Sequence, residues 1–303
     1  MNARRQLGIN PASQRGIALV LVLWVIILVT ITSGAYALMA RMDQLEANAL
    51  LSGTRARMIA EAGIHLTAVQ LRDNDDLMRP VADGRIYQMT LDGVQLEIGI
   101  TDERGKLDIN ASDEPTMALF FANHGLDMGE AELLAAAVMD WRDPDEIERV
   151  NGAEIDTYLN AGLEVGPANR PFMMIDELLQ VIGMPYNLYR AIEPGITVFS
   201  RSATPDPAYA PVEALLALPD IGPEDAQEFV NQRMTLEPGD NSGVALPDGQ
   251  VIMAQGRGLT YSIHAKATMP NGVWEQLEAT IRLGGSQTGM PFRVLRWREG
   301  FHH

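Results

Sequence analysis

The most strongly patterned part of the chain is an uninterrupted run of apolar residues near its beginning. Residues 17–40, IALVLVLWVIILVTITSGAYALMA, carry no charged side chain. At a helical rise of about 1.5 Å per residue, this run would extend for about 36 Å, which is enough to cross the hydrocarbon layer of a bilayer. The pattern therefore predicts a transmembrane helix.

Beyond this run the pattern changes to that of a helix with one apolar face. Residues 41–72 contain no proline. Apolar or small side chains recur there at spacings of three, four and seven residues, at Leu45, Ala49, Ala56, Ile59, Gly63 and Leu66. We expect the helix to continue unbroken out of the membrane, with its outer half laid on a globular part. The alternative is that residues 41–72 form the first helix of a soluble domain.

Two groups of predicted strands lie far apart in the remaining chain. Residues 85–91 and 94–102 flank Asp92-Gly93, a dipeptide that readily takes the positive φ angles of a type I′ turn and so predicts a β-hairpin. Further extended segments are expected at 106–110, 259–268, 273–283 and 292–298.

Between the two groups of strands, short apolar segments alternate with proline and glycine, which is typical of short helices. The expected helices are 116–124, 129–141, 174–182, 186–192, 211–218 and 223–234. Residues 178–185 and 215–223 each place an apolar helix end, a glycine turn and a proline in the order of a helix-hairpin-helix motif. Such turns bind the DNA backbone in some proteins and only pack helices in others. The order of elements predicts an α+β fold, with an antiparallel sheet interrupted by an all-helical insertion.

The charges give the chain an orientation and argue against one class of partner. Arg4, Arg5 and Arg15 precede the apolar run, and the first acidic residue is Asp43, so the N-terminus should stay in the cytoplasm and the remainder should be exported. The chain has 23 Lys and Arg against 40 Asp and Glu, a net charge of −17. This excess argues against nucleic-acid binding and favours packing as the role of the helix-hairpin-helix segments.

Three kinds of N-terminal signal fit the apolar run. A secretory signal peptide would be cleaved after Ala35-Tyr36-Ala37, whereas an uncleaved anchor would keep the whole segment. A type IV pilin-like signal would be cut before the apolar run, so that the helix remains in the mature protein. The helical continuation over residues 41–72 favours the third kind, because a cleaved secretory signal has no physical need of it.

The sequence shows no pattern typical of an enzyme. Cysteine is absent, which excludes disulfides, thiolate metal sites and a cysteine nucleophile. His65, His124 and His264 occur singly, and neither an H-E-x-x-H nor a Walker A motif is present. We therefore expect no enzymatic activity.

Carboxylates crowd one segment of the helical part. They are Asp140, Asp143, Asp145, Glu146, Glu148, Glu154 and Asp156. Calcium takes six to eight oxygen ligands from a bent loop of this kind, and Pro144 and Gly152 would provide the bends. The run of residues that an EF-hand requires is missing. Residue types alone leave two alternatives open, a calcium site and a solvated acidic loop.

Several short motifs, in this order and spacing, resemble protein K of bacterial type II secretion, the GspK family of minor pseudopilins. They lie at 14–19, 102–111, 140–145, 152–154, 175–178 and 183–184. The resemblance implies that prepilin peptidase cleaves after Gly16 and methylates Ile17. It also implies a calcium site at Asp140, Asp143 and Glu154, with Asp145 and Asp156 as further candidates.

The same resemblance implies a domain order. A prepilin leader (1–16) would precede a transmembrane helix (17–40), a pilin-like stem with the first strands (41–112), an inserted helical domain (113–235) and the C-terminal strands that complete the sheet (236–303). Two features bear on the family's pattern. Leu21 stands at the fifth position after the cut, where most pilins have glutamate. An unpaired glutamate in a bilayer is costly, so its absence suits a subunit at the tip, which has no subunit of its kind ahead of it. Residues 203–210 depart from the Asn-Thr-Ala-rich turn that the family tends to have.

The function implied is structural. The protein would span the inner membrane once, with its N-terminus cytoplasmic and its C-terminal domain periplasmic. It would join the minor pseudopilins I and J, and through them H and the major pseudopilin G, at the tip of a pseudopilus that pushes folded proteins toward the outer-membrane secretin. The alternatives are a minor pilin of a type IV pilus and an exported acidic metal-binding domain behind a cleaved signal peptide.

Overall fold

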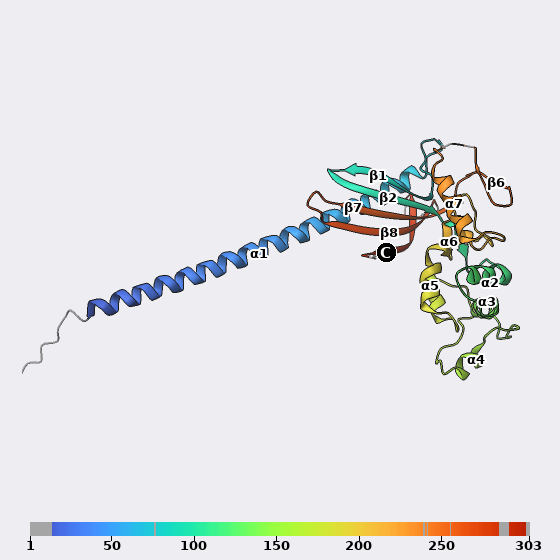
Figure 1. Ribbon diagram of the computed structural model, residues 1–303, viewed down its shortest axis with the longest axis horizontal. Coiled ribbons are helices and arrows are strands. Elements are labelled where there is room, and N and C mark those ends of the chain that lie inside the picture. The colour runs from blue at the N-terminus through green and yellow to red at the C-terminus, as the bar shows by residue number, and fades with distance from the viewer. Residues whose placement is uncertain are drawn as a thin grey trace, which may run out of the picture. The chain divides into compact units, whose positions relative to one another are not determined.

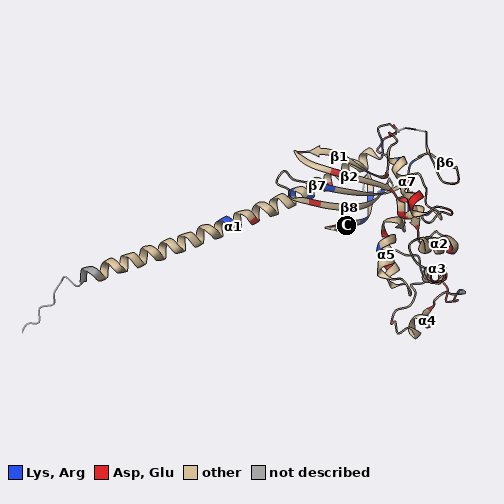
Figure 2. Cartoon of the chain, viewed as in Figure 1, with Lys and Arg blue, Asp and Glu red and all other residues tan. Residues whose placement is uncertain are grey.

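The computed structural model describes residues 14–75, 77–238, 240, 242–254, 256–284 and 291–300. The chain divides into two compact units, Met1–Arg55 and Ala56–His303. The helix α1 (Gln14–Gln70) runs without a break through this division for 57 residues, so the predicted continuation of the apolar helix is confirmed. The part of α1 in the first unit has exposed side chains throughout residues 17–51, and its apolar part shows no charged residue in Figure 2. Among the described helices, α1 alone is long and apolar enough to span a membrane, with a mean hydropathy of 2.7.

The second unit contains a five-stranded antiparallel sheet with the strand order β1-β2-β7-β8-β9 (Figure 1). Its strands are β1 (Asp83–Leu91), β2 (Val94–Asp102), β7 (Thr260–Thr268), β8 (Trp274–Leu283) and β9 (Phe292–Glu299). The hairpin of β1 and β2 turns at Asp92 and Gly93, whose φ angles are 51° and 74°, as the sequence predicts. Because β2 pairs with β7, the sheet is assembled from segments on either side of the helical insertion.

The C-terminal part of α1 packs against this sheet through small side chains. Ala56, Ala60 and Ala68 are fully buried together with Ile64. A Cβ atom at Gly63 would lie 2.7 Å from Leu96 Cδ2, so glycine permits a close approach of helix and sheet. The predicted apolar face is only partly right, since Leu66 is exposed. The contact follows the row of small residues four positions apart, because these allow the backbone to come nearest to the sheet.

The insertion between β2 and β7 is mainly helical, as predicted. It contains α2 (Glu114–Asn123), α3 (Met128–Arg142), α4 (Ile155–Asn160), α5 (Tyr186–Ile192), α6 (Val212–Leu215) and α7 (Pro223–Met234), the 3₁₀ helices η2 (Glu103–Gly105), η3 (Ile175–Gln180) and η4 (Glu193–Gly195), and the small strands β3 (Leu107–Asp108), β4 (Ile196–Thr197), β5 (Val244–Ala245) and β6 (Val251–Ile252). Asp113 and Asp127 cap α2 and α3 by accepting hydrogen bonds from backbone N–H groups. The expected helix over 174–182 is a 3₁₀ helix, and α4 was not predicted. The predicted strand at 106–110 shrinks to β3, which pairs with β4 in parallel rather than with the main sheet.

A buried polar network joins the sheet to the insertion where β2 ends. Glu103 is 2 % exposed and accepts hydrogen bonds from Lys106 Nζ at 2.8 Å and from Ser262 Oγ of β7 at 2.7 Å. It also accepts a hydrogen bond from the hydroxyl of Thr197 in β4. Asp102 pairs with Arg104 at 2.9 Å and caps the 3₁₀ turn η2. The motif at 102–106 thus fixes the angle at which the chain leaves the sheet.

Alanine at Gly105 is expected to destabilise this junction by about 2–3 kcal/mol. A Cβ atom there would lie 2.4 Å from the backbone carbonyl of Tyr209, and backbone atoms cannot turn aside as a flexible side chain can. Urea unfolding of the full chain in mild detergent measures the loss. The control is Gly129→Ala in the first turn of α3, where the new methyl group meets only Asp127 Oδ1 at 3.3 Å. An equal effect of the two substitutions would contradict the prediction.

Candidate functional site

The acidic segment forms a loop between the end of α3 and the start of α4. Asp140 is fully buried in the last turn of α3, and its Oδ2 accepts hydrogen bonds from the backbone N–H groups of Arg149 (3.2 Å) and Ala153 (2.8 Å). A Cβ atom at Gly152 would stand 1.9 Å from this oxygen, so only glycine allows the loop to close over Asp140. The buried carboxylate of Asp140 therefore holds two points of the loop backbone, Arg149 and Ala153, against the end of α3.

The loop brings three of the five predicted ligands together. Asp143 is the C-cap residue of α3, and Glu154 is the N-cap residue of α4 and is 4 % exposed. Asp143 Oδ1 and both carboxylate oxygens of Glu154 are buried and accept no hydrogen bond from the described residues. Asp145 and Asp156 are exposed, and Asp145 accepts a hydrogen bond from the backbone of Ile147. The orphaned buried oxygens of Asp143 and Glu154 fit a calcium ion's need for oxygen ligands.

Arg149 is the loop residue that the sequence analysis missed. Its Nε lies 3.1 Å from Asp140 Oδ1, and a terminal nitrogen lies 2.9 Å from Asp143 Oδ2. The signal available in the sequence was its position, since Arg149 lies between Glu148 and Glu154 and is a countercharge within the acidic segment itself. No group of three or more ligating side chains in the described part of the chain is arranged to hold a metal ion. Arg149 occupies two of the predicted ligands as their countercharge, so a cation would compete with it for Asp140 and Asp143.

The carboxylates of the loop repel one another. Burial, followed by the negative charges of Asp140, Asp143, Asp145 and Glu146, raises the pKa of Glu154 to about 7. Burial likewise raises the pKa of Asp140, against the backbone N–H groups that favour its ionised form. Near neutral pH the folded loop consequently carries an electrostatic cost that a divalent cation would relieve.

Glu154→Gln is expected to stabilise the calcium-free protein at neutral and alkaline pH. The folded state binds the Glu154 proton more tightly than the unfolded state does. The contribution of this group to the free energy of unfolding is therefore favourable at acidic pH and is lost as the pH rises toward about 7. The variant should be more stable than the parent by about 1–3 kcal/mol above that pH, and equal to it well below the ordinary glutamate pKa. Urea unfolding in a chelating buffer at several pH values measures the difference. The control is Glu146→Gln at an exposed position, and the same pH profile there would count against a special environment for Glu154.

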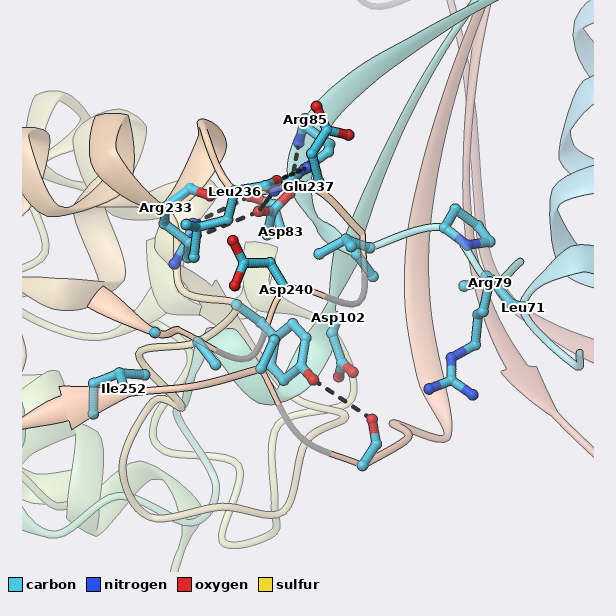
Figure 3. A pocket seen from close by; sticks show the side chains of 18 of the residues that line it. Leu71, Arg79, Asp83, Arg85, Asp102, Arg233, Leu236, Glu237, Asp240 and Ile252 are labelled. Carbon is cyan, nitrogen blue, oxygen red and sulfur yellow. Dashed lines mark hydrogen bonds and ion pairs between the residues drawn. The ribbon is translucent and has the colours of Figure 1, made fainter. Parts of the chain in front are cut away.

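A second candidate is a cavity of about 280 Å³ beside the junction (Figure 3). Asp83, the first residue of β1, accepts hydrogen bonds from Arg85 Nε and a terminal nitrogen of Arg85 at 2.9 Å each, and lies 3.7 Å from Nε of Arg233 in α7. Arg233 is 6 % exposed and also donates hydrogen bonds to the carbonyls of Pro207 and Asp83. Because the most buried charges of this cavity pair with one another, we interpret it as part of the junction between sheet and insertion.

The predicted processing site lies at the beginning of α1. Gly16 and Ile17 are helical, and the side chain of Ile17 is exposed. Residues 1–13, which hold Arg4, Arg5 and most of the predicted leader, lie outside the described residues. Cleavage after Gly16 stays a prediction.

Comparison with known proteins adds the following similarities. The family model for type II secretion system (T2SS), protein K, matches residues 101–201, a range that holds the junction motif and the acidic loop. Type II secretion system protein K of Pectobacterium carotovorum subsp. carotovorum is 26% identical over 251 residues, which are 73% of this chain and 75% of the relative. The protein of the same name from Klebsiella pneumoniae is 29% identical over 60% of this chain and 61% of its own length. That from Dickeya chrysanthemi is 33% identical over 36% of this chain and 31% of its own length.

The fold is also similar to a solved structure. It resembles a chain in the crystal structure of the GspK-GspI-GspJ complex from the enterotoxigenic Escherichia coli type 2 secretion system, with a TM-score of 0.54 and 18% identity over 87% of this chain and 99% of that chain. This likeness concerns the architecture, which is the mixed helix and sheet fold expected from the sequence. In sequence and in fold the chain is therefore similar to type II secretion system protein K, in agreement with the resemblance of its short motifs.

Proposed function

We propose that the protein stands at the tip of a pseudopilus, together with the minor pseudopilins I and J and through them H and the major pseudopilin G. The observation that supports this most is α1, which is one helix from the apolar segment to the core of the sheet. Such a helix can be held in a membrane at one end and in a filament along its length, while its head remains outside. The fold's similarity to a chain of the GspK-GspI-GspJ complex supports the choice of partners.

The proposed orientation follows from charge. The arginines before the apolar run would keep the N-terminus in the cytoplasm, so that the sheet and the insertion fold in the periplasm. The insertion enlarges one subunit between β2 and β7 with elements that the sheet itself does not require. Its bulk would prevent another subunit from packing ahead of this one, and a filament would consequently start here. The work proposed is structural, namely starting assembly and helping the growing filament push folded proteins toward the secretin.

The intact mass and the N-terminal peptide of protein taken from host membranes test this proposal. A chain that begins with methylated Ile17 supports processing by prepilin peptidase. A chain that begins at Leu38 indicates an ordinary signal peptide, and one that keeps Met1 indicates an uncleaved anchor. Either result would overturn the pseudopilin role. Co-purification with I and J, rather than with pilins of a type IV pilus, separates the pseudopilus from the alternative filament.

We further propose that the loop between α3 and α4 binds calcium through Asp140, Asp143 and Glu154, with Asp145 and Asp156 as further candidate ligands. The ion would neutralise carboxylates that otherwise repel one another. The side chains are already placed by the fold, since Asp140 holds the loop backbone and Glu154 is the residue before the first turn of α4. Calorimetry on the full chain should detect calcium binding in the micromolar to millimolar range, weakened by at least about tenfold in Glu154→Gln. Glu146→Gln should bind as the parent does. If the parent protein did not bind calcium, the proposed calcium site would be wrong.

A further inference from the structure

A groove of about 340 Å³ borders the junction network at Glu103 and Arg104. The groove is lined by residues 199–201 and 257–260 together with Glu103, Arg104 and Arg282. Thr260 of β7 is directly opposite Arg282 of β8 in the strand register. Since the neighbouring Ile281 belongs to the core beneath α1, alternation along the strand places Arg282 on the sheet face that points away from α1. The groove is therefore formed by the free face of the sheet and the insertion.

Arginines dominate this groove although the chain as a whole is acidic. Four of its lining residues are Arg104, Arg201, Arg257 and Arg282, in a protein of net charge −17. The one carboxylate in the lining, Glu103, already accepts hydrogen bonds from Lys106, Ser262 and Thr197. The local charge is thus opposite in sign to that of the protein.

Two of the four guanidinium groups lack any partner among the residues that the structure describes, and a third has only uncharged ones. Arg104 pairs with Asp102, and Arg257 donates hydrogen bonds to the backbone carbonyl of Asp73 and the side chain of Asn74. In contrast, the guanidinium groups of Arg201 and Arg282 have neither an ion-pair nor a hydrogen-bond partner among the residues that the structure describes. Both are accessible, with Arg201 exposed and Arg282 half-buried.

The strand register adds a further unfavourable contact to this arrangement. Arg282 of β8 is directly opposite Arg293 of β9, and like charges in that position destabilise a sheet. The segment that joins the two strands, residues 284–291, contains no aspartate or glutamate. An anion from outside the chain would relieve this repulsion.

We propose that the groove binds the carboxylates of an acidic segment of a partner protein. A guanidinium group presents a planar fork of donors that fits a carboxylate with two parallel hydrogen bonds. Leu259, 58% exposed, and Phe199 lie among the arginines, and they offer a neighbouring apolar side chain a place to pack. This combination of charge and apolar surface favours a polypeptide over a free phosphate or a lipid headgroup. The inference goes beyond the proposed function and does not depend on it, because binding at the groove requires no assembled pseudopilus.

Fluorescence anisotropy with a labelled peptide tests the proposal on the full-length protein in a neutral detergent. The probe is an acetylated, amidated hexapeptide that alternates pairs of glutamate with leucine, and its counterpart carries glutamine in place of glutamate. We expect the acidic peptide alone to bind, with an affinity that falls as salt is added. In the double variant R201Q/R282Q the affinity should fall at least about tenfold. The variant R57Q/R170Q removes two arginines whose side chains are about half exposed outside the groove, and it should bind as the parent does.

Several outcomes would overturn the proposal. One is a change of less than about twofold in R201Q/R282Q, and another is equal binding of the glutamine peptide. Displacement of the peptide by an equal concentration of inorganic phosphate would indicate a simple anion site. Preferential binding of phosphatidylglycerol vesicles would indicate a lipid site. Should R201Q/R282Q not fold, the single variant Arg201→Gln at an exposed position carries the same test.

Discussion

Replacing Tyr158 with alanine is expected to lower the free energy of unfolding by about 3–5 kcal/mol, as truncation of large buried aromatic side chains does. Tyr158 is the largest fully buried side chain of the protein's described part. Its ring lies 6.2 Å from that of Trp141 at the end of α3, and its hydroxyl oxygen accepts a hydrogen bond from the backbone N–H of Ile182 at 3.0 Å. The substitution would leave a cavity between α3 and α4 and an N–H group without its partner.

Urea unfolding of the full chain, followed by near-ultraviolet circular dichroism, measures this loss. The matched control is Tyr158→Phe, which keeps the ring and removes only the acceptor of the Ile182 N–H group, at a cost of about 1–2 kcal/mol. Calcium affinity should also fall in Tyr158→Ala, because α4 begins at the proposed ligand Glu154. If the two variants were equally stable, the ring would not be filling the core between α3 and α4.

Elements that depend on local chemistry could be predicted from the sequence, whereas α4, which is held in place by Tyr158, could not. The turn at Asp92-Gly93 depends on local chemistry, so the sequence pattern predicts it correctly. The helix α4 has only six residues and no periodic apolar face. It is held by the burial of one ring against another helix, which is a tertiary contact that a local pattern does not contain.

The same distinction applies to the acidic loop. The sequence identified the crowded carboxylates as candidate ligands. The fold then distinguishes them by burial, because Asp140 and Glu154 are enclosed while Asp145 and Asp156 face solvent. The need for glycine at position 152 arises from the carboxylate of Asp140 standing where a Cβ atom would be. Twelve positions separate these two residues in the sequence, and only the folded loop brings them into contact.

The second large effect is expected at Asp83, where alanine should destabilise the protein by about 3–5 kcal/mol. The carboxylate is buried between two arginines, Arg85 and Arg233, and Arg233 is itself 6 % exposed. Burial lowers the pKa of Arg233, yet a guanidinium group stays charged in proteins. Asp83→Ala therefore leaves a positive charge inside the junction with carbonyl oxygens as its remaining partners.

The double variant D83A/R233M separates the cost of an unpaired charge from the value of the pair. Replacing both partners of a buried ion pair with apolar groups is often nearly neutral, so this variant should be more stable than Asp83→Ala alone even though it carries one more substitution. Arg57→Ala provides the surface comparison, since the pair of Arg57 and Glu299 is about half exposed and its loss should cost less than about 1 kcal/mol. Urea midpoints of the parent and the three variants suffice.

A double variant less stable than Asp83→Ala would mean that Arg233 holds α7 to the sheet through its carbonyl hydrogen bonds rather than through Asp83. A loss at Asp83 no larger than that at Arg57 would mean that the junction is open to water and that its charges are solvated.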